Sequence, residues 1–310
     1  MRRAEQVMSH QPVERDYTVP KEAGEEPARA DEQNDVLLSE LVRRGKLTLR
    51  QASRALKWQR RRGVGEQEAV EQMRLVNRED MLKALSQRYS YPILEDIPEN
   101  RRFSRELVTG HDPFGEAAEA IRSIRSAIAA TALAEGTRSF AIMAPHGKAG
   151  ATYLACNLAV GFAQMAIPTL LVDANLRRPR AGELFGLPRG TEGLSELLRR
   201  KNLGLSPIKA DVIPNLSILP AGAVPPNPQE LLSSPEFLAL TDMFHERFGV
   251  VIYDTADISR YSDALVIGSR VNAAIIVGRR HRTSYNDVSK LAKKLESIRC
   301  NVIGTVFNQY

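Results

Sequence analysis

The stretch FAIMAPHGKAGATYLACNLAVGFAQM, residues 140–165, decides the fold of this chain. It opens with the apolar, β-rich run Phe140–Ala144, continues through a loop that contains two glycines, and ends in a helical pattern from Thr152 to Met165. Backbone N–H groups of such a loop, together with the N-terminus of the next helix, are suited to bind phosphate groups. The alternative is an ordinary strand-to-helix turn, because the usual Gly-Lys-Ser/Thr ending of a phosphate-binding loop is absent.

Further apolar, β-rich runs follow this stretch and alternate with helical patterns such as Pro235–Phe248 and Thr283–Ile298. The predicted strands are Thr169–Asp173, Leu216–Leu219, Val250–Asp254, Ala273–Gly278 and Val302–Phe307. Near-continuous apolar strands separated by helices are typical of a parallel sheet that is covered by helices on both faces. The expected fold class is therefore α/β, a P-loop parallel sheet preceded by a small all-α domain. Ligands of such sheets bind at the carboxyl ends of the strands.

Two of the predicted strands end in an aspartate. The carboxylate of Asp173 is placed to hold a metal ion or to orient an attacking hydroxyl group, or else it caps the next turn. Asp254 follows four apolar residues in a Walker B-like pattern, which predicts contact with magnesium through water. Thr152, at the start of its helix, is placed to ligate the same ion. Arg177 and Arg178 carry charge that suits phosphate or an acidic partner surface.

The N-terminal third has a different character. Residues 1–34 are polar and aperiodic, which indicates a disordered tail. Leu47–Gln59 and Val76–Arg88 look like two copies of one helical repeat, in which Thr48 and Asn77 are placed to cap the helices. The predicted organisation is a disordered tail (1–34), a helical N-terminal domain (35–92), a linker (93–112) and a P-loop domain (113–310).

The composition is that of a soluble globular protein, with 43% hydrophobic and 26% charged residues. Cys156 and Cys300 lie in apolar contexts, so we expect two buried thiols in a reducing compartment. No run approaches the ~18 apolar residues that a membrane helix needs, and the first residues lack an apolar signal core. A cytoplasmic protein is expected, which reaches a membrane only through a partner or a surface patch.

The net charge of +6 is unevenly distributed, because nine cationic residues lie between Arg43 and Arg62. A basic helical surface can meet nucleic acid, anionic lipid or an acidic partner, and it can also be a solvated helix face. Trp58 is the one aromatic residue within this run. Since stacking platforms for bases need several aromatic side chains, nucleic-acid binding is not expected.

A series of motifs carries a family resemblance. VDANLRRP, ELFGL, GLSELL, LPAGAVPPNPQELLSS, VIYDTAD, SDA and GTVFNQ follow one another between His111 and the C-terminus, over about two thirds of the 310 residues. In this order they resemble the bacterial tyrosine kinases of capsule and exopolysaccharide synthesis, P-loop proteins related to the cell-division and partitioning ATPases. HDPF at residues 111–114 and the helical N-terminal module resemble the EpsG-type chain-length determinant kinases.

The N-terminal module also looks like the helical N-terminal domain of type II secretion ATPases, some of which bind cyclic-di-GMP. Both repeats of this chain lack the Arg-Leu-Gly element of that binding motif. Cyclic-di-GMP binding is therefore not expected.

The resemblance implies ATP and Mg²⁺ as cofactors and assigns site residues by matching positions. The implied magnesium ligands are Thr152, Asp173 and Asp254, and the catalytic residues are Asp173, Asp254 and Lys148. The implied nucleotide-binding residues are Gly147, Lys148, Gly150, Ala151, Thr152, Tyr153 and, near the adenine, Asn308. The implied partner is a membrane chain-length determinant (Wzz-like) protein, which would hold the chain at the inner membrane.

Glu119, Arg122 and Arg125 match the ExxRxxR motif with which this family self-associates into rings. Their spacing of three places them on one helix face, which agrees with a contact surface, although an ordinary surface helix has the same spacing. A homo-oligomer is therefore expected.

Two positions depart from the family pattern. Ala151 stands where relatives have the lysine or arginine that contacts the β- and γ-phosphates, and Asn175 stands where they have an aspartate. Lys148, three residues before Ala151, is a candidate replacement for the lost cation. Three functions stay open: an ATP-dependent tyrosine kinase, a pseudokinase scaffold with a degenerate Walker A loop, and a partitioning-type ATPase, against which PPNPQELL and NLRRP argue.

Overall fold

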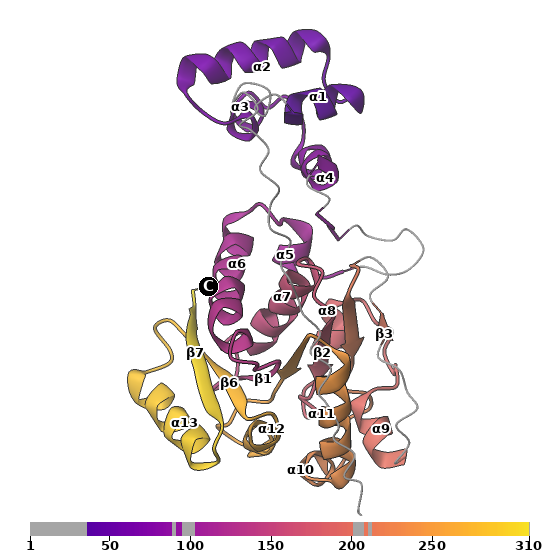
Figure 1. The fold of residues 1–310 in the computed structure, drawn as a ribbon, viewed down its shortest axis with the longest axis vertical. Helices are drawn as coiled ribbons and strands as arrows, with labels where there is room; N and C mark the ends of the chain where they lie inside the picture. Colours follow the sequence, from indigo (N-terminus) through magenta and orange to yellow (C-terminus); the bar gives the residue numbers. More distant parts are fainter. Residues whose placement is uncertain (1–35, 89–90, 95–102, 201–207, 210–212, 310) are drawn as a thin grey trace, which may run out of the picture. The chain divides into compact units, whose positions relative to one another are not determined.

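The computed structural model describes residues 36–88, 91–94, 103–200, 208–209 and 213–309, so the tail predicted for residues 1–34 lies outside the described residues. The chain divides into two compact units, Met1–Val76 and Asn77–Tyr310 (Figure 1). The division falls inside the helical domain predicted for residues 35–92, whose boundaries stay predictions.

Residues 36–76, the described part of the first unit, form three helices, α1 (Val36–Arg43), α2 (Leu49–Arg62) and α3 (Glu66–Gln72). The predicted cap of α2 is confirmed, because the Thr48 hydroxyl accepts a hydrogen bond from Gln51 N at 3.2 Å and the Gln51 side chain accepts one from Thr48 N at 2.9 Å. Such a reciprocal box satisfies two N–H groups that a helix start leaves unpaired. Leu37, Leu38, Leu41, Ala52, Ala55, Ala69 and Val70 are buried.

The second predicted cap is also confirmed. Helix α4 (Arg78–Arg88) begins after Asn77, whose side-chain oxygen accepts a hydrogen bond from Asp80 N at 2.8 Å. The structure groups α4 with the second unit. None of the helices within the described ranges is long and apolar enough to cross a membrane.

The second unit is built on one sheet with the strand order β3-β4-β2-β5-β1-β6-β7. The strands are β1 (Ser139–Met143), β2 (Thr169–Asp173), β3 (Ile208–Lys209), β4 (Leu216–Leu219), β5 (Val250–Asp254), β6 (Ala273–Arg279) and β7 (Asn301–Asn308). All pairs are parallel except β3 with β4. The predicted α/β class is confirmed.

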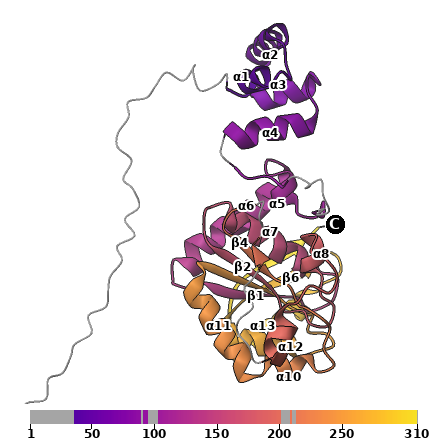
Figure 2. The ribbon, with the colours of Figure 1, turned by 90° about the vertical axis from the view of Figure 1, so that its right-hand side faces the viewer.

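Helices cover both faces of this sheet, as Figure 2 shows with α6 and α7 above it and α10 to α13 below it. They are α5 (Val108–His111), α6 (Glu116–Ile128), a π-helical turn (Ala129–Leu133), α7 (Ala151–Ala163), α8 (Ala181–Leu184), α9 (Leu194–Arg200), α10 (Pro228–Leu232), α11 (Pro235–Arg247), α12 (Asp263–Val271) and α13 (Tyr285–Ser297). Alternate strand residues point to opposite faces, so Phe140 and Ile142 pack on the α6–α7 side while Ala141 and Met143 pack on the other.

Residues 103–112, which the sequence predicts to be linker, pack onto the second unit. Phe103 and Leu107 are buried, and Ser104 N donates to the Leu184 carbonyl at 2.9 Å. Asn157 of α7 is fully buried, and its side chain forms hydrogen bonds with this segment. Its amide nitrogen donates to the Glu106 carbonyl at 2.8 Å, and its amide oxygen accepts from Thr109 N at 3.0 Å. The segment is thus fixed to helix α7.

Replacing Asn157 by alanine should lower the free energy of unfolding by about 3 kcal/mol, because it leaves a buried N–H and buried carbonyl groups without partners. Urea unfolding of the full chain, followed by circular dichroism, measures this loss. The matched control is Asn301→Ala, since Asn301 is exposed. A loss that does not exceed the control's would contradict the tethering of residues 106–109 to α7.

Candidate functional site

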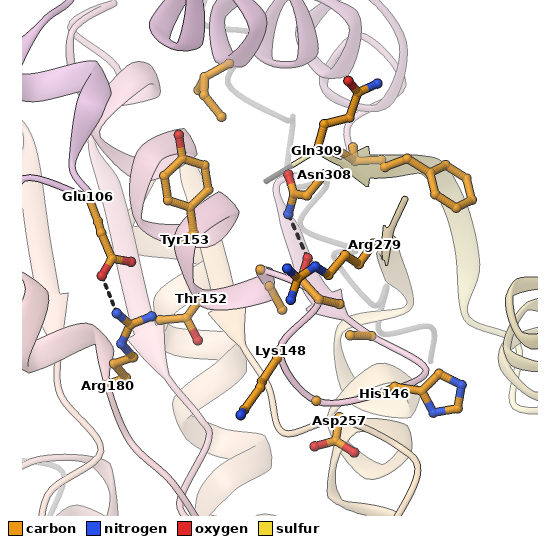
Figure 3. Close-up of a pocket in the computed structure, with 18 of the residues that line it drawn as sticks. Glu106, His146, Lys148, Thr152, Tyr153, Arg180, Asp257, Arg279, Asn308 and Gln309 are labelled. Carbon is orange, nitrogen blue, oxygen red and sulfur yellow. Dashed lines mark hydrogen bonds and ion pairs between the residues drawn. The ribbon is translucent and has the colours of Figure 1, made fainter. Parts of the chain in front are cut away.

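A cavity of about 1110 Å³ lies at the carboxyl ends of β1, β2 and β5 (Figure 3). The β1–α7 loop, the loops after β2 and β5, the end of β7, the start of α6 and Glu106 form its walls. The residues predicted to bind nucleotide all line it: Gly147, Lys148, Gly150, Ala151, Thr152, Tyr153 and Asn308. The structure therefore brings the predicted loop and the end of the last strand to one site.

The loop before α7 has the backbone of a tight turn. Gly150 has φ +93° directly before the helix begins, a conformation that glycine adopts without steric cost. Lys148 has φ +64°, and a side chain on Gly147 would come within 3.1 Å of an Asp257 carboxylate oxygen. Asn308 donates from its amide to the Ala149 carbonyl at 2.8 Å. In this structure Asn308 thus supports the loop, and its role near an adenine stays a prediction.

Thr152 and Asp254 are in direct contact. The Thr152 hydroxyl donates to Asp254 Oδ2 at 2.7 Å. Asp254 is fully buried, and its Oδ1 has no hydrogen-bond partner among the described residues. Mg²⁺ is held in proteins by one or two carboxylates while it keeps several waters, so a hydroxyl beside a half-satisfied carboxylate fits this ion. Asp254 and Thr152 would hold it.

Asp173 lies beside Asp254, because the two residues are register partners on the neighbouring strands β2 and β5. Its carboxylate accepts hydrogen bonds from the backbone N–H groups of Asn175 (3.3 Å), Arg180 (3.0 Å) and Ala181 (2.9 Å). The capping role considered from the sequence is therefore present. The role of Asp173 as a metal ligand or catalytic residue stays a prediction.

The two aspartates have perturbed acidities. Burial raises the pKa of Asp173 to about 6. Burial also raises the pKa of Asp254 well above its usual range, and the negative charge of Asp173 raises it further. Burial and charge repulsion both disfavour the ionised forms of two neighbouring carboxyl groups in a low-dielectric site. A bound cation would remove this penalty.

The two arginines of the loop after β2 have different surroundings. Arg177 forms two hydrogen bonds with Asp263, at 2.5 and 3.0 Å, and its guanidinium lies 3.7 Å from the ring centre of Tyr261. Arg177 is therefore engaged with a structural partner, whereas Arg178 lines the cavity. Asn175 also lines the cavity, and its amide oxygen accepts from Arg178 N at 3.1 Å. The Asn175 side chain can accept the same hydrogen bond as an aspartate at this position, but it carries no negative charge.

The predicted self-association residues lie along α6. Arg122 forms an ion pair with Glu119 and donates to the Pro113 carbonyl. Arg125 donates to the Gly161 carbonyl of α7 at 2.9 Å, so it packs within its own chain. Glu119 is 65% exposed. Ring-like self-association through these residues stays a prediction.

The residues of the cavity wall that were not identified from the sequence include an acid–base pair. Glu106 and Arg180 line the cavity and form an ion pair with each other. Arg180 closes the same NLRRPR stretch as Arg178, so its charge was a usable signal. Glu106 lies in the predicted linker, and nothing in its local pattern places it at the site.

No family model matches the chain. Among curated proteins, the tyrosine-protein kinase YwqD of Bacillus subtilis is 30% identical over 207 residues, which cover 67% of this chain and 87% of YwqD. The tyrosine-protein kinase wzc of Salmonella typhi is 29% identical over 203 residues, which cover 66% of this chain but only 28% of wzc.

Among solved structures, the chimerical protein CapA2B2 superposes with a TM-score of 0.61 at 30% identity, over 73% of this chain and 97% of the other. The kinase domain of the Escherichia coli tyrosine kinase ETK superposes with a TM-score of 0.63 at 27% identity, over 73% of this chain and 85% of the other. The fold, the sequence identity and the length of the matched region all agree on one family. The chain belongs to the bacterial tyrosine-kinase family, the BY-kinases.

Proposed function

We propose that the chain binds ATP with Mg²⁺ in this cavity and acts as a tyrosine kinase-like component that regulates the chain length and export of an exopolysaccharide. The observation that carries the proposal is the Thr152–Asp254 pair at the carboxyl end of β5, directly beside the loop that opens α7. The names of its relatives, which are tyrosine-protein kinases, support the reaction class.

The residues that line the cavity, and the buried aspartates beside it, have separable roles in this proposal. The N–H groups of the loop from Gly147 to Thr152, with the N-terminus of α7, would bind the phosphates. Thr152 and Asp254 would hold the metal ion, which when bound neutralises charge on the β- and γ-phosphates. Asp173 would keep the loop after β2 in place through its backbone contacts and would face the attacking hydroxyl of a tyrosine.

A second candidate is a pseudokinase scaffold, which Ala151 favours. This residue lines the cavity with a methyl group where the family has a cation, and Asn175 adds a second loss of charge. In this role the chain would assemble through Glu119, Arg122 and Arg125 and bind a membrane chain-length determinant protein at the cytoplasmic side of the inner membrane. A partitioning-type ATPase is disfavoured, since the relatives at 30% identity are named tyrosine kinases.

The experiment is a titration of the full chain with labelled ATP, with and without Mg²⁺. Wild type should bind ATP more tightly with Mg²⁺, and Thr152→Val should lose that metal-dependent gain of roughly tenfold, in line with the value of one charge-assisted contact. Thr191→Val is the control, because Thr191 does not line the cavity. Absence of ATP binding by wild type would overturn the proposal. Transfer of phosphate to a tyrosine peptide then separates a kinase from a scaffold.

A further inference from the structure

Ala151 brings no charge to the cavity, but cationic side chains line it elsewhere, and the backbone of one of them, Arg180, is fixed by hydrogen bonds. The backbone N–H of Arg180 donates to Asp173 at 3.0 Å, and the next N–H, that of Ala181, donates to the same oxygen at 2.9 Å. These bonds hold the Arg180 backbone against the end of β2. Its guanidinium lines the cavity together with the loop before α7.

Arg180 and Glu106 form their ion pair on the left of Thr152 in Figure 3, while Lys148 and Asp257 lie below the loop. The Glu106 backbone is fixed as well, because its carbonyl accepts the Asn157 amide at 2.8 Å. Both partners thus have anchored backbones and side chains that face the cavity.

The ion pair itself is easily exchanged. The side chains are 48% and 43% exposed, and pairs that water can reach contribute little to stability. A phosphate group carries more charge than one carboxylate and matches the planar fork of a guanidinium. A phosphate that enters the cavity should therefore displace Glu106 from Arg180.

We propose that Arg180 supplies the positive charge that the loop lacks at Ala151, and that Glu106 holds Arg180 until the phosphates of ATP replace it. This inference rests on the proposed ATP-binding function. It assigns the substitute cation to Arg180, whose backbone N–H is fixed by Asp173, rather than to Lys148. Glu106 then competes with the phosphates of ATP for the Arg180 guanidinium.

The test compares variants of the full chain in titrations with Mg·ATP and with AMP. Arg180→Gln should weaken Mg·ATP binding by roughly 10- to 100-fold, the value of a hydrogen bond to a charged group, and leave AMP binding unchanged. Glu106→Gln should strengthen Mg·ATP binding by about two- to fivefold, because it removes a competing exposed ion pair. Arg180→Lys should fall between wild type and Arg180→Gln.

The matched controls are Arg200→Gln and Glu192→Gln. Arg200 and Glu192 form an ion pair outside the cavity, with side chains 57% and 44% exposed, so their replacement should leave both affinities unchanged. Adding Ala151→Lys to the Arg180→Gln chain should restore most of the lost affinity for Mg·ATP.

The outcomes separate the two proposals. If wild type binds neither ATP nor AMP, the proposed function fails and the role of Arg180 fails with it. If wild type binds Mg·ATP and Arg180→Gln binds it equally well, only the assignment of Arg180 is overturned. Loss of binding in Lys148→Ala, with Arg180→Gln unaffected, would transfer the role to Lys148.

Discussion

Replacing Ala151 by lysine is expected to raise the rate of tyrosine phosphorylation by ATP about 10²-fold, the effect of one positioned electrostatic donor. Ala151 is the first residue of α7 and lines the cavity, so a longer side chain has room to extend toward bound phosphates. A lysine there would bring back the cation that the family places beside the transferred phosphate. The gain should be larger in the Arg180→Gln chain, which lacks the proposed substitute cation.

The control is Ala151→Met, which adds similar length without charge. Both variants are compared with wild type in single-turnover transfer of labelled phosphate to a tyrosine peptide, after their affinities for Mg·ATP have been measured. Equal rates in the lysine variant and in wild type, with ATP bound, would show that charge at this position does not limit the reaction. A gain shared by the methionine variant would point to packing as its cause.

Replacing Asp254 by asparagine should have opposite effects on activity and stability. Phosphoryl transfer should fall by roughly 10²–10³-fold, because the buried carboxylate beside Thr152 would no longer attract the metal ion. The metal-free chain should at the same time become more stable by about 2 kcal/mol at pH 8. Among the described residues, buried Asp254 Oδ1 has no hydrogen-bond partner, and its neighbour Asp173 repels a second negative charge.

The stability gain should depend on pH. Burial raises the pKa of Asp173 to about 6 and that of Asp254 well above its usual range, so the folded wild type binds protons more tightly than the unfolded chain. Wild-type stability is then greatest below the unfolded-state pKa of about 4 and falls as the pH rises through 6 and above. The advantage of Asp254→Asn should therefore shrink as the pH falls and largely disappear near the unfolded-state pKa of about 4.

Urea unfolding of metal-free protein from about pH 4 to pH 8 measures this dependence. Asp242→Asn is the control, because Asp242 is exposed on α11 and should change neither activity nor the pH profile. A destabilised Asp254→Asn chain at pH 8 would refute the view that the two carboxyl groups strain the metal-free fold.

The sequence allowed most of the central sheet to be predicted, because buried parallel strands are continuous apolar runs. Thr169–Asp173, Leu216–Leu219 and Val250–Asp254 agree with β2, β4 and β5 at both ends. Strand β3 was missed, since it has two residues and is the antiparallel edge of the sheet. Helix caps depend on residues that are close in the sequence, so the caps at Thr48 and Asn77 were predicted correctly.

Side-chain partners that are distant in the sequence could not be predicted. Arg177 was assigned to phosphate or a partner surface because its motif is basic, but its carboxylate partner, Asp263, lies 86 residues later. Glu106 was placed in a linker because the residues that tie it to the site, Asn157 and Arg180, lie 51 and 74 residues later. For Asp173 the sequence left two roles possible, a metal ligand or a cap of the next turn. The structure shows the backbone contacts of the cap, and the metal role stays a prediction.

The hydrogen bonds of Asn157 bear on where a shortened version of this protein should begin. A fragment that starts at residue 113, the predicted edge of the P-loop domain, would lack Phe103, Leu107 and the backbone groups that pair with Asn157. It would expose an apolar patch over α7 and remove two of the hydrogen bonds of the Asn157 side chain. A recombinant fragment that retains residues from Asn77 onward would keep both the patch covered and Glu106 beside Arg180.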